Sequence, residues 1–155
     1  MAYLCLECYE TYQMHLPYCP KTSCHGEIIE VDDLMLPVIM LLNQRGYYTE
    51  FCCSGHVYEG SCYPYVAFSS FFNQLLNEKE FNELFKELPE PWHIENGTQN
   101  MRILRCKIEN GTMFEVQKAI CEANLRLLEF VNMLPSLLCD EEDNDEEMQV
   151  GIIYE

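Results

Sequence analysis

Cys5-Leu-Glu-Cys8 is followed, ten residues later, by Cys19-Pro-Lys-Thr-Ser-Cys24. Two closely spaced pairs are typical of a small zinc ribbon, in which each pair lies on a tight turn and four thiolates bind one tetrahedral ion at about 2.3 Å. Four cysteine ligands leave no open position, so we expect a structural zinc rather than a catalytic one. The alternatives are four unrelated buried thiols, or a site in which His25 replaces Cys24.

The predicted ribbon covers residues 1–31. Roughly thirty residues bury too little apolar surface to fold alone, so the metal is expected to supply the missing stability. The ribbon carries one lysine against four acidic residues, which are Glu7, Glu10, Glu27 and Glu30. Nucleic-acid binding gains affinity from neutralised phosphates, so this ribbon lacks the charge to read DNA or RNA.

The composition places the chain among globular, cytoplasmic proteins. It has 155 residues, of which 48% are apolar, and ten are cysteines. No run of about 18 uncharged apolar residues exists, so no membrane span is expected. The N-terminus lacks a basic region followed by an apolar one, so no secretory signal is visible. Without export, the cysteines favour reduced thiols and metal ligation over disulfides.

The chain is strongly acidic, with a formal net charge of −17. This charge excludes generic nucleic-acid binding and favours a basic protein partner. Seven of the eight residues in 140–147 are acidic. We therefore expect 140–155 to be a largely disordered acidic tail.

Between ribbon and tail, residues 32–139 predict an α+β domain. Hydrophobic periodicity and turn residues indicate alternating helices and strands. The expected helices run from a cap at Asp32 or Asp33 to Arg45, over 71–88 with a break near Asn77, and from a capping box at Thr112 and Glu115 to before Pro135. The expected strands are 27–31, 47–53, 63–69, 92–95 and 101–109.

This order predicts a small zinc ribbon followed by an antiparallel or mixed sheet covered by three helices. If 27–31 is the first strand of that sheet, the order contains a β-α-β-β-α-β unit, which is the ferredoxin-like arrangement.

A second cluster, Cys52-Cys53-Ser54-Gly55-His56, comes at the end of a predicted strand, with Cys62 nearby. Three interpretations compete. In the first, the cysteines belong to the core and the remaining residues form a turn. In the second, backbone N–H groups from Ser54 to His56 form an anion-binding site, and Gly55 allows a ligand to approach the backbone. In the third, Cys53, His56 and Cys62 hold a second metal, or a Cys–His pair acts as a nucleophile.

Aromatic and basic side chains flank this cluster. Tyr58 and Tyr65 are candidates for a ligand wall, because each offers a flat face and a hydroxyl group. Trp92 and His93 could face the same pocket, although such residues are commonly core or surface. Three basic residues gather on one predicted strand, where we expect ion pairs with local carboxylates or a phosphate contact; they are Arg102, Arg105 and Lys107.

Three stretches together resemble a family of small proteins from phages and from Gram-positive bacteria and their mobile elements. They are Cys19-Pro20 to Cys24, Val31-Asp32-Asp33-Leu34-Met35-Leu36-Pro37, and Gly46-Tyr47-Tyr48-Thr49-Glu50-Phe51-Cys52-Cys53-Ser54-Gly55-His56. The resemblance covers residues 1 to about 70 well and implies a setting rather than an activity. The chain departs from the family in the four residues between Cys19 and Cys24 and in its acidic tail.

The stretch Thr49 to Gly55 is also similar to the Cys-Ser-Gly loop of the wybutosine-synthesis methyltransferase family, where an arginine follows the glycine; here it is His56.

No Gly-rich phosphate loop, Ser-His-Asp order or His-Glu-x-x-His motif is present. We therefore expect a non-enzymatic, phage-encoded binding protein that captures a host protein or a small nucleotide-like signal, as a host-defence inhibitor would. The ligand-binding residues would be Cys53, Ser54, Gly55, His56, Tyr58 and Tyr65. The alternatives are an enzyme that uses this loop for a nucleotide or S-adenosylmethionine substrate, and an acidic mimic of nucleic acid. Self-association into a homo-oligomer is compatible with each.

Overall fold

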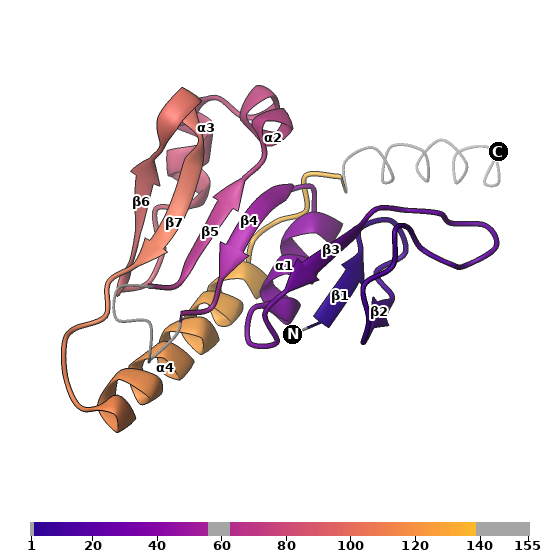
Figure 1. Cartoon of the computed structure of the whole chain (residues 1–155). Helices are drawn as coiled ribbons and strands as arrows, with labels where there is room; N and C mark the ends of the chain where they lie inside the picture. Colours follow the sequence, from indigo (N-terminus) through magenta and orange to yellow (C-terminus); the bar gives the residue numbers. More distant parts are fainter. Residues whose placement is uncertain (1, 56–62, 139–155) are drawn as a thin grey trace, which may run out of the picture.

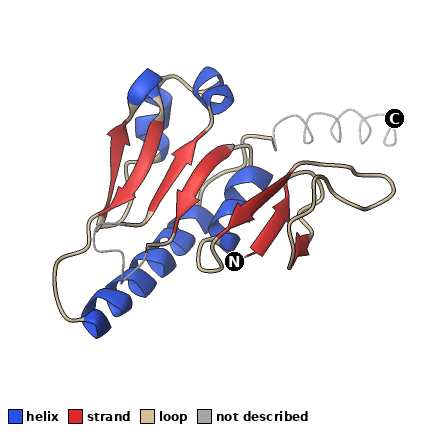
Figure 2. Cartoon of the chain, viewed as in Figure 1, coloured by secondary structure: helices blue, strands red, loops and turns tan. Residues whose placement is uncertain are grey.

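The computed structural model of the chain describes residues 2–55 and 63–138. It confirms the predicted α+β class, with two antiparallel sheets and four α-helices in this part of the chain (Figure 1; Figure 2). The strands are β1 (Ala2–Cys5), β2 (Thr11–Tyr12), β3 (Ile28–Val31), β4 (Thr49–Cys53), β5 (Tyr65–Phe68), β6 (Trp92–Asn96) and β7 (Arg102–Cys106). The helices are α1 (Leu36–Gln44), α2 (Ser70–Leu75), α3 (Glu78–Leu84) and α4 (Met113–Asn132), with a 3-10 turn, η2, at Thr98–Asn100.

The N-terminal sheet has the strand order β2-β1-β3, and β1 is antiparallel to both neighbours. The pairing of β1 with β3 runs from Ala2↔Val31 to Cys5↔Ile28. Because Cys5 is the last paired residue of β1, the strand pairing fixes the position of the first predicted ligand.

The second sheet has the order β4-β5-β7-β6, and each neighbouring pair is antiparallel. The ferredoxin-like arrangement is not formed, because it requires 27–31 to join this sheet and β3 pairs with β1 instead. The physical reason lies in the cysteines. Gathering them at one point brings the chain after Cys24 back beside Cys5, where β3 finds its partner. Helix α1 then connects the two sheets (Figure 1).

Two helices begin where local capping signals predict. The Thr112 hydroxyl accepts a hydrogen bond from Glu115 N at 3.2 Å, and Glu115 Oε1 accepts one from Thr112 N at 2.8 Å. Asn77 and Glu80 form the same reciprocal pair at the start of α3. This second capping box divides the predicted helical region 71–88 into α2 and α3, so four helices replace the expected three.

Helix α1 begins later than its expected cap at Asp32 or Asp33. Its first residue is Leu36, and Met35 holds the N-cap position without a side-chain hydrogen bond. Asp32 Oδ2 instead accepts hydrogen bonds from Ser54 N at 2.9 Å and Ser54 Oγ at 3.1 Å. A contact with a residue distant in sequence therefore replaces the local cap.

Helices α3 and α4 pack on one face of the four-stranded sheet. Trp92 Nε1 donates a hydrogen bond to Ala123 O of α4 at 2.8 Å. The Phe68 ring of β5 lies 5.6 Å from the Phe81 ring and 5.8 Å from the Phe85 ring. Successive strand residues point to opposite faces, so the strand residues that alternate with Phe68 and Trp92 lie on the other face of the sheet, which we call the outer face. There, Phe51 is 54% exposed.

Arg45, at the C-terminal end of α1, forms hydrogen bonds with carbonyl groups at the C-terminal end of α4. Its Nη1 atom donates hydrogen bonds to three carbonyls at 2.7, 2.9 and 3.2 Å, those of Val131, Asn132 and Leu134. The Tyr47 hydroxyl donates to Pro135 O at 2.7 Å. A cation that binds the last carbonyls of a helix also complements the helix dipole, so α4 ends against α1.

A single main core crosses the predicted boundary at residue 31. Leu4 of β1 and Val31 of β3 are 0% and 1% exposed, and they belong to the same buried cluster as Leu42 and Phe68. The cysteine end of the N-terminal sheet has a small cluster of its own, made by Cys5, Cys19 and Ile28. The predicted division at 31 thus separates the two sheets while the main core joins them. The predicted acidic tail, 140–155, lies outside the described residues.

Within the described ranges, no helix has both the length and the apolar character that crossing a membrane requires.

The adjacent residues Phe71 and Phe72 test which face of α2 is buried. Phe72 is 0% exposed and its ring stacks on Phe68 at 4.7 Å, whereas Phe71 is 55% exposed. We expect Phe72→Ala to lower the free energy of unfolding by about 3–5 kcal/mol, since it leaves a cavity. Phe71→Ala should cost less than about 1 kcal/mol. Urea denaturation followed by Trp92 fluorescence measures both, and equal losses would contradict the packing.

Candidate functional site

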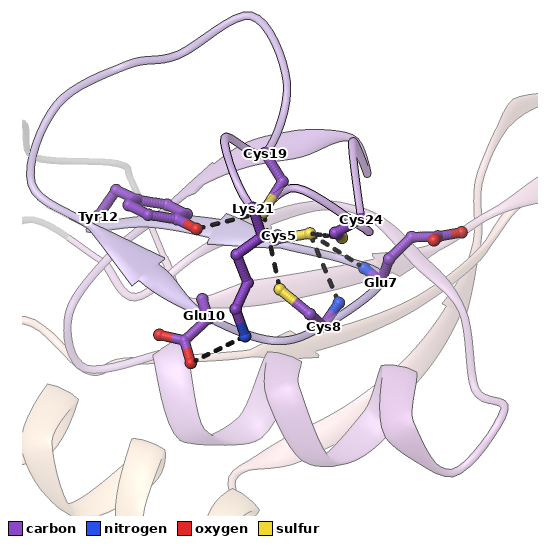
Figure 3. Close-up of polar contacts among 8 residues, drawn as sticks. All are labelled: Cys5, Glu7, Cys8, Glu10, Tyr12, Cys19, Lys21 and Cys24. Atoms are coloured by element: carbon purple, nitrogen blue, oxygen red, sulfur yellow. Dashed lines mark hydrogen bonds and ion pairs between the residues drawn. The ribbon is translucent and has the colours of Figure 1, made fainter.

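The four N-terminal cysteines come together at the end of the three-stranded sheet (Figure 3). Their sulfur atoms all lie within 4.8 Å of one another. Cys5 Sγ is 3.5 Å from Cys24 Sγ, and Cys8 Sγ is 3.7 Å from Cys19 Sγ. These separations are too long for a disulfide. Four sulfurs bound at about 2.3 Å to a tetrahedral ion are about 3.8 Å apart. The group can therefore hold a metal ion.

The first pair lies on a tight turn whose amides point at a sulfur. Glu7 N donates to Cys5 Sγ at 3.4 Å, and Cys8 N donates to the same atom at 3.5 Å. Tyr9, with φ of +63°, closes the turn and donates from N to Cys5 O at 3.0 Å. These two contacts hold the Cys5 sulfur against the turn.

The second pair packs directly against the first turn. Cys19 N donates to Gly26 O at 2.9 Å, and Cys24 N donates to Lys21 O at 3.1 Å. A Cβ atom on Gly26 would lie 2.6 Å from Glu7 Cγ and 2.8 Å from Cys5 Sγ. Only glycine lets the two turns approach this closely, so Gly26 belongs to the construction of the site.

Thiols crowded at one point differ widely in acidity. Burial raises the pKa of Cys24 to about 12. Burial also acts to raise the pKa of Cys19, but hydrogen bonds from the Tyr12 hydroxyl, 3.2 Å away, and from the Lys21 backbone lower it to about 7. Four sulfurs this close cannot all ionise near neutral pH without a cation, and a divalent ion would supply the compensating charge.

The alternative in which His25 replaces Cys24 is not formed. Among the described residues, the group of potential metal ligands contains Cys24 and leaves out His25. His25 is exposed, and its ring lies 5.9 Å from the ring of Tyr18.

Ser54 and Gly55, from the second cluster, come directly after β4. Ser54 is buried, and its N and Oγ atoms both donate to Asp32. Its carbonyl accepts a hydrogen bond from Asn124 Nδ2 of α4 at 3.2 Å. Gly55 has φ of +95°, and a Cβ atom there would meet the ring of Pro64 at 3.0 Å. The sequence analysis predicted that the Ser54 N–H group binds an external anion. In the structure this N–H group donates to the carboxylate of Asp32 instead.

Two thiols of the four-stranded sheet, Cys52 and Cys106, have raised pKa values. Burial raises the pKa of Cys52 to about 11, and the nearby Asp32 carboxylate adds to the effect. Burial also raises the pKa of Cys106, on β7, to about 12. A protonated thiol is a poor nucleophile, so these two cysteines are placed for packing. Cys53 is 8% exposed, and its Sγ accepts a hydrogen bond from Gly55 N at 3.4 Å.

A row of four side chains crosses the outer face of the four-stranded sheet. The register pairs Cys53 with Tyr65, Tyr65 with Arg105, and Arg105 with His93. The Arg105 guanidinium carbon lies 5.4 Å from the centre of the Tyr65 ring. The row therefore begins beside Ser54 and joins two predicted ligand residues, Cys53 and Tyr65, to two that lie far away in the sequence.

Glu95 bonds to both His93 and Arg105, the two residues at one end of this row. Its Oε2 lies 2.6 Å from His93 Nε2, and its Oε1 accepts a hydrogen bond from Arg105 Nε at 3.1 Å. The bond to His93, together with the nearby Arg105, lowers the pKa of the Glu95 carboxyl group. The predicted ion pair of Arg105 with a local carboxylate is thus present.

Other predicted neighbours are separated by the sheet. Trp92 points into the core, whereas His93 lies on the outer face, so the two do not share a pocket. Arg102 also points inward, with its guanidinium carbon 4.9 Å from the centre of the Phe81 ring. No sequence signal identified Asp32 or Asn124 as partners of Ser54, because both contacts are long-range.

Three residues of the predicted second cluster, His56, Tyr58 and Cys62, lie outside the described residues. The predicted ligand role of His56 and Tyr58 and the predicted metal site of Cys53, His56 and Cys62 therefore stay predictions.

The candidate metal site makes a direct prediction for cysteine variants. Cys5→Ser and Cys19→Ser each remove one of four ligands, so we expect the purified protein to lose its metal ion and the N-terminal sheet to lose order. Cys121→Ser is the matched control, because Cys121 is half-buried on α4 and outside the group. Elemental analysis of reduced protein measures the content. A full metal complement in Cys5→Ser, or none in the unmodified chain, would overturn the assignment.

A second prediction concerns Gly26. Gly26→Ala places a methyl group against Glu7 and Cys5 Sγ, so the turns must separate, and we expect metal affinity to fall about 10-fold to 100-fold, as for other residues that orient ligands. Competition with a chromogenic chelator measures the affinity. Gly111→Ala, where the new Cβ would meet the Glu115 side chain, should leave the affinity unchanged.

Comparison of the chain with protein-family models, with curated proteins and with solved structures gave no match. The resemblance to the family from phages and Gram-positive bacteria thus stays a prediction.

Proposed function

We propose that this chain is a non-enzymatic binding protein, stabilised by a structural zinc ion, that captures a small nucleotide-like ligand at the end of β4. The family resemblance implies a phage or Gram-positive setting, and in that setting we propose that the protein is phage-encoded, acts in the host cytoplasm and removes a host-defence signal. The ligand would lie against Cys53, Ser54, Gly55 and Tyr65, with His56 and Tyr58 contributing from the segment that follows β4.

Zinc is the metal that this donor set favours. Four thiolates at tetrahedral spacing suit zinc, which has no geometric preference of its own and binds sulfur well. With all four positions filled by protein, the ion has no site for water or substrate. Its role is to hold the N-terminal sheet against the main core.

Capture fits the thiols better than catalysis does. The raised pKa values of Cys52, on β4, and Cys106, on β7, keep both as neutral thiols. The enzyme alternative would have to use Cys53 or His56, on a chain whose acidity works against a thiolate.

The row of side chains on the outer sheet face is the observation that carries the ligand class. The Tyr65 ring offers a flat surface, and the Arg105 guanidinium beside it offers a bidentate donor for phosphate. A planar base with an attached phosphate matches this pairing of ring and cation. Because Asp32 already occupies the Ser54 amide, Arg105 takes over the role of anion contact.

The net charge of −17 opposes an anionic ligand at long range. At physiological ionic strength, charges separated by more than about 8 Å are largely screened. Contact with Arg105 acts within that distance, and so does Glu95, whose Oε1 lies 3.1 Å from Arg105 Nε. Binding is therefore best measured in about 0.15 M salt or above.

Capture of a host protein is the second candidate function. The acidity of the chain and its exposed large apolar side chains favour it, since Phe114 is 76% exposed and Met133 is 83% exposed. Mimicry of nucleic acid would depend largely on the acidic segment 140–147, and deletion of 140–155 tests it.

Calorimetry with a panel of cyclic and ADP-ribose-type nucleotides tests the ligand proposal. We expect one panel member to bind, and Arg105→Gln to weaken that binding about 10-fold or more, because it removes a charged hydrogen bond to phosphate. Tyr65→Leu should weaken binding by removing the stacking face. Lys118→Gln, with the same charge change on the exposed face of α4, is the control.

Two outcomes would count against the proposal. A normal affinity in both Arg105→Gln and Tyr65→Leu would remove the sheet face from the site. A ligand recovered in altered form after denaturation of the complex would establish turnover in place of capture.

A further inference from the structure

A groove lies between the C-terminal ends of α3 and α4, away from the ligand site. Its volume is about 530 Å³, and its lining is formed by Leu84 of α3, by Pro89 after it, and by the last turn of α4 with the residues that follow. Leu134 is buried at 7% exposure and packs into the main core. The Phe130 ring contacts Phe85 with 5.6 Å between ring centres. The apolar part of the groove is thus anchored in the core of the protein.

Met133 stands at the edge of this groove and is 83% exposed, more than any other large apolar side chain in the described ranges. A flexible thioether that adapts its shape is common at surfaces that bind protein partners. An exposed apolar surface continuous with the core, bordered by charged side chains, is typical of an interaction site.

The charges at the border are mainly acidic. Glu87 and Glu129 line the groove, and neither makes an ion pair with a described residue. Arg126 also lines the groove and keeps its positive charge, with Nη1 donating a hydrogen bond to Glu90 O at 3.0 Å, while Lys86 Nζ lies 2.8 Å from Glu83 Oε1. Two carboxylates beside an apolar groove, on a chain of charge −17, complement a cationic segment.

We propose that this groove docks a basic segment of a protein partner, which inserts an apolar side chain between Phe130 and Met133 and places Lys or Arg side chains beside Glu87 and Glu129. The apolar contact supplies affinity, and the carboxylates steer the segment and fix its orientation. This surface is separate from the nucleotide-like ligand site, so either proposal can fail while the other stands.

The test uses a 14-residue amphipathic peptide of leucine and lysine, with a second peptide of equal charge in which serine replaces leucine. Fluorescence anisotropy with the full zinc-loaded chain measures both affinities. We expect the leucine peptide to bind at least tenfold more tightly than the serine peptide. Met133→Ser should weaken the leucine peptide about fivefold to tenfold, and Met113→Ser, at a 68% exposed methionine at the other end of α4, should not.

Charge reversal isolates the electrostatic part. Glu129→Lys and Glu30→Lys change the net charge equally, but only Glu129 borders the groove. Glu129→Lys should weaken the leucine peptide at least fivefold more than Glu30→Lys does. Both exposed sites leave folding intact, which circular dichroism verifies. Equal effects of the two reversals, or of the two methionine variants, would overturn the proposal.

Two other occupants are distinguishable. A dimer in sedimentation that Met133→Ser dissociates would assign the groove to a second copy of the chain and overturn a basic partner. A full-length variant with Ile152→Ser and Ile153→Ser that binds the leucine peptide more tightly would assign it to the apolar C-terminal segment instead.

Discussion

The convergence of four sulfur atoms within 4.8 Å is the constraint on which the remaining structure depends. It fixes the end of β1 at Cys5 and returns the chain after Cys24 to the side of β1, so that β3 pairs there. This pairing carries Leu4 and Val31 into the main core, where they meet residues of α1 and the four-stranded sheet. A metal ion at the sulfurs would therefore stabilise more than a local turn. Its binding free energy would be coupled to the packing of the whole N-terminal sheet, because the two sheets share one core.

Local signals predicted the elements that depend on neighbours in sequence. The capping boxes of α3 and α4 are formed, and the paired cysteines meet as their spacing indicates. Non-local choices were not predictable in the same way. Asp32 has the residue type and position of a helix cap, yet its carboxylate binds Ser54, which lies 22 residues further along. The partner of β3 was likewise undetermined, because hydrophobic alternation identifies a strand and its faces but not the strand beside it.

The candidate ligand site also combines residues that local signals predicted with residues that only the sheet order brings together. Cys53 and Tyr65 were both predicted as ligand-binding residues, and the antiparallel register of β4 and β5 pairs them directly. The contribution of Arg105 and His93 depends on the order β5-β7-β6, which no short motif encodes. Because side chains alternate between the two faces of β6 and β7, residues that are adjacent or clustered in the sequence lie on opposite faces of the sheet. Trp92 and Arg102 enter the core, and His93 and Arg105 remain on the outer face beside Glu95.

The acidity of the chain affects the two proposed surfaces in opposite ways. A nucleotide-like anion at the outer sheet face is repelled at long range and gains affinity only on contact with Arg105 and Tyr65, so its binding depends on geometry. A basic segment is attracted by the summed charge before it reaches the groove, and Glu87 and Glu129 then orient it. Salt screens both long-range forces. Rising ionic strength should therefore weaken the proposed protein docking and relieve the repulsion of the proposed small ligand, which would let one acidic chain keep two kinds of recognition apart.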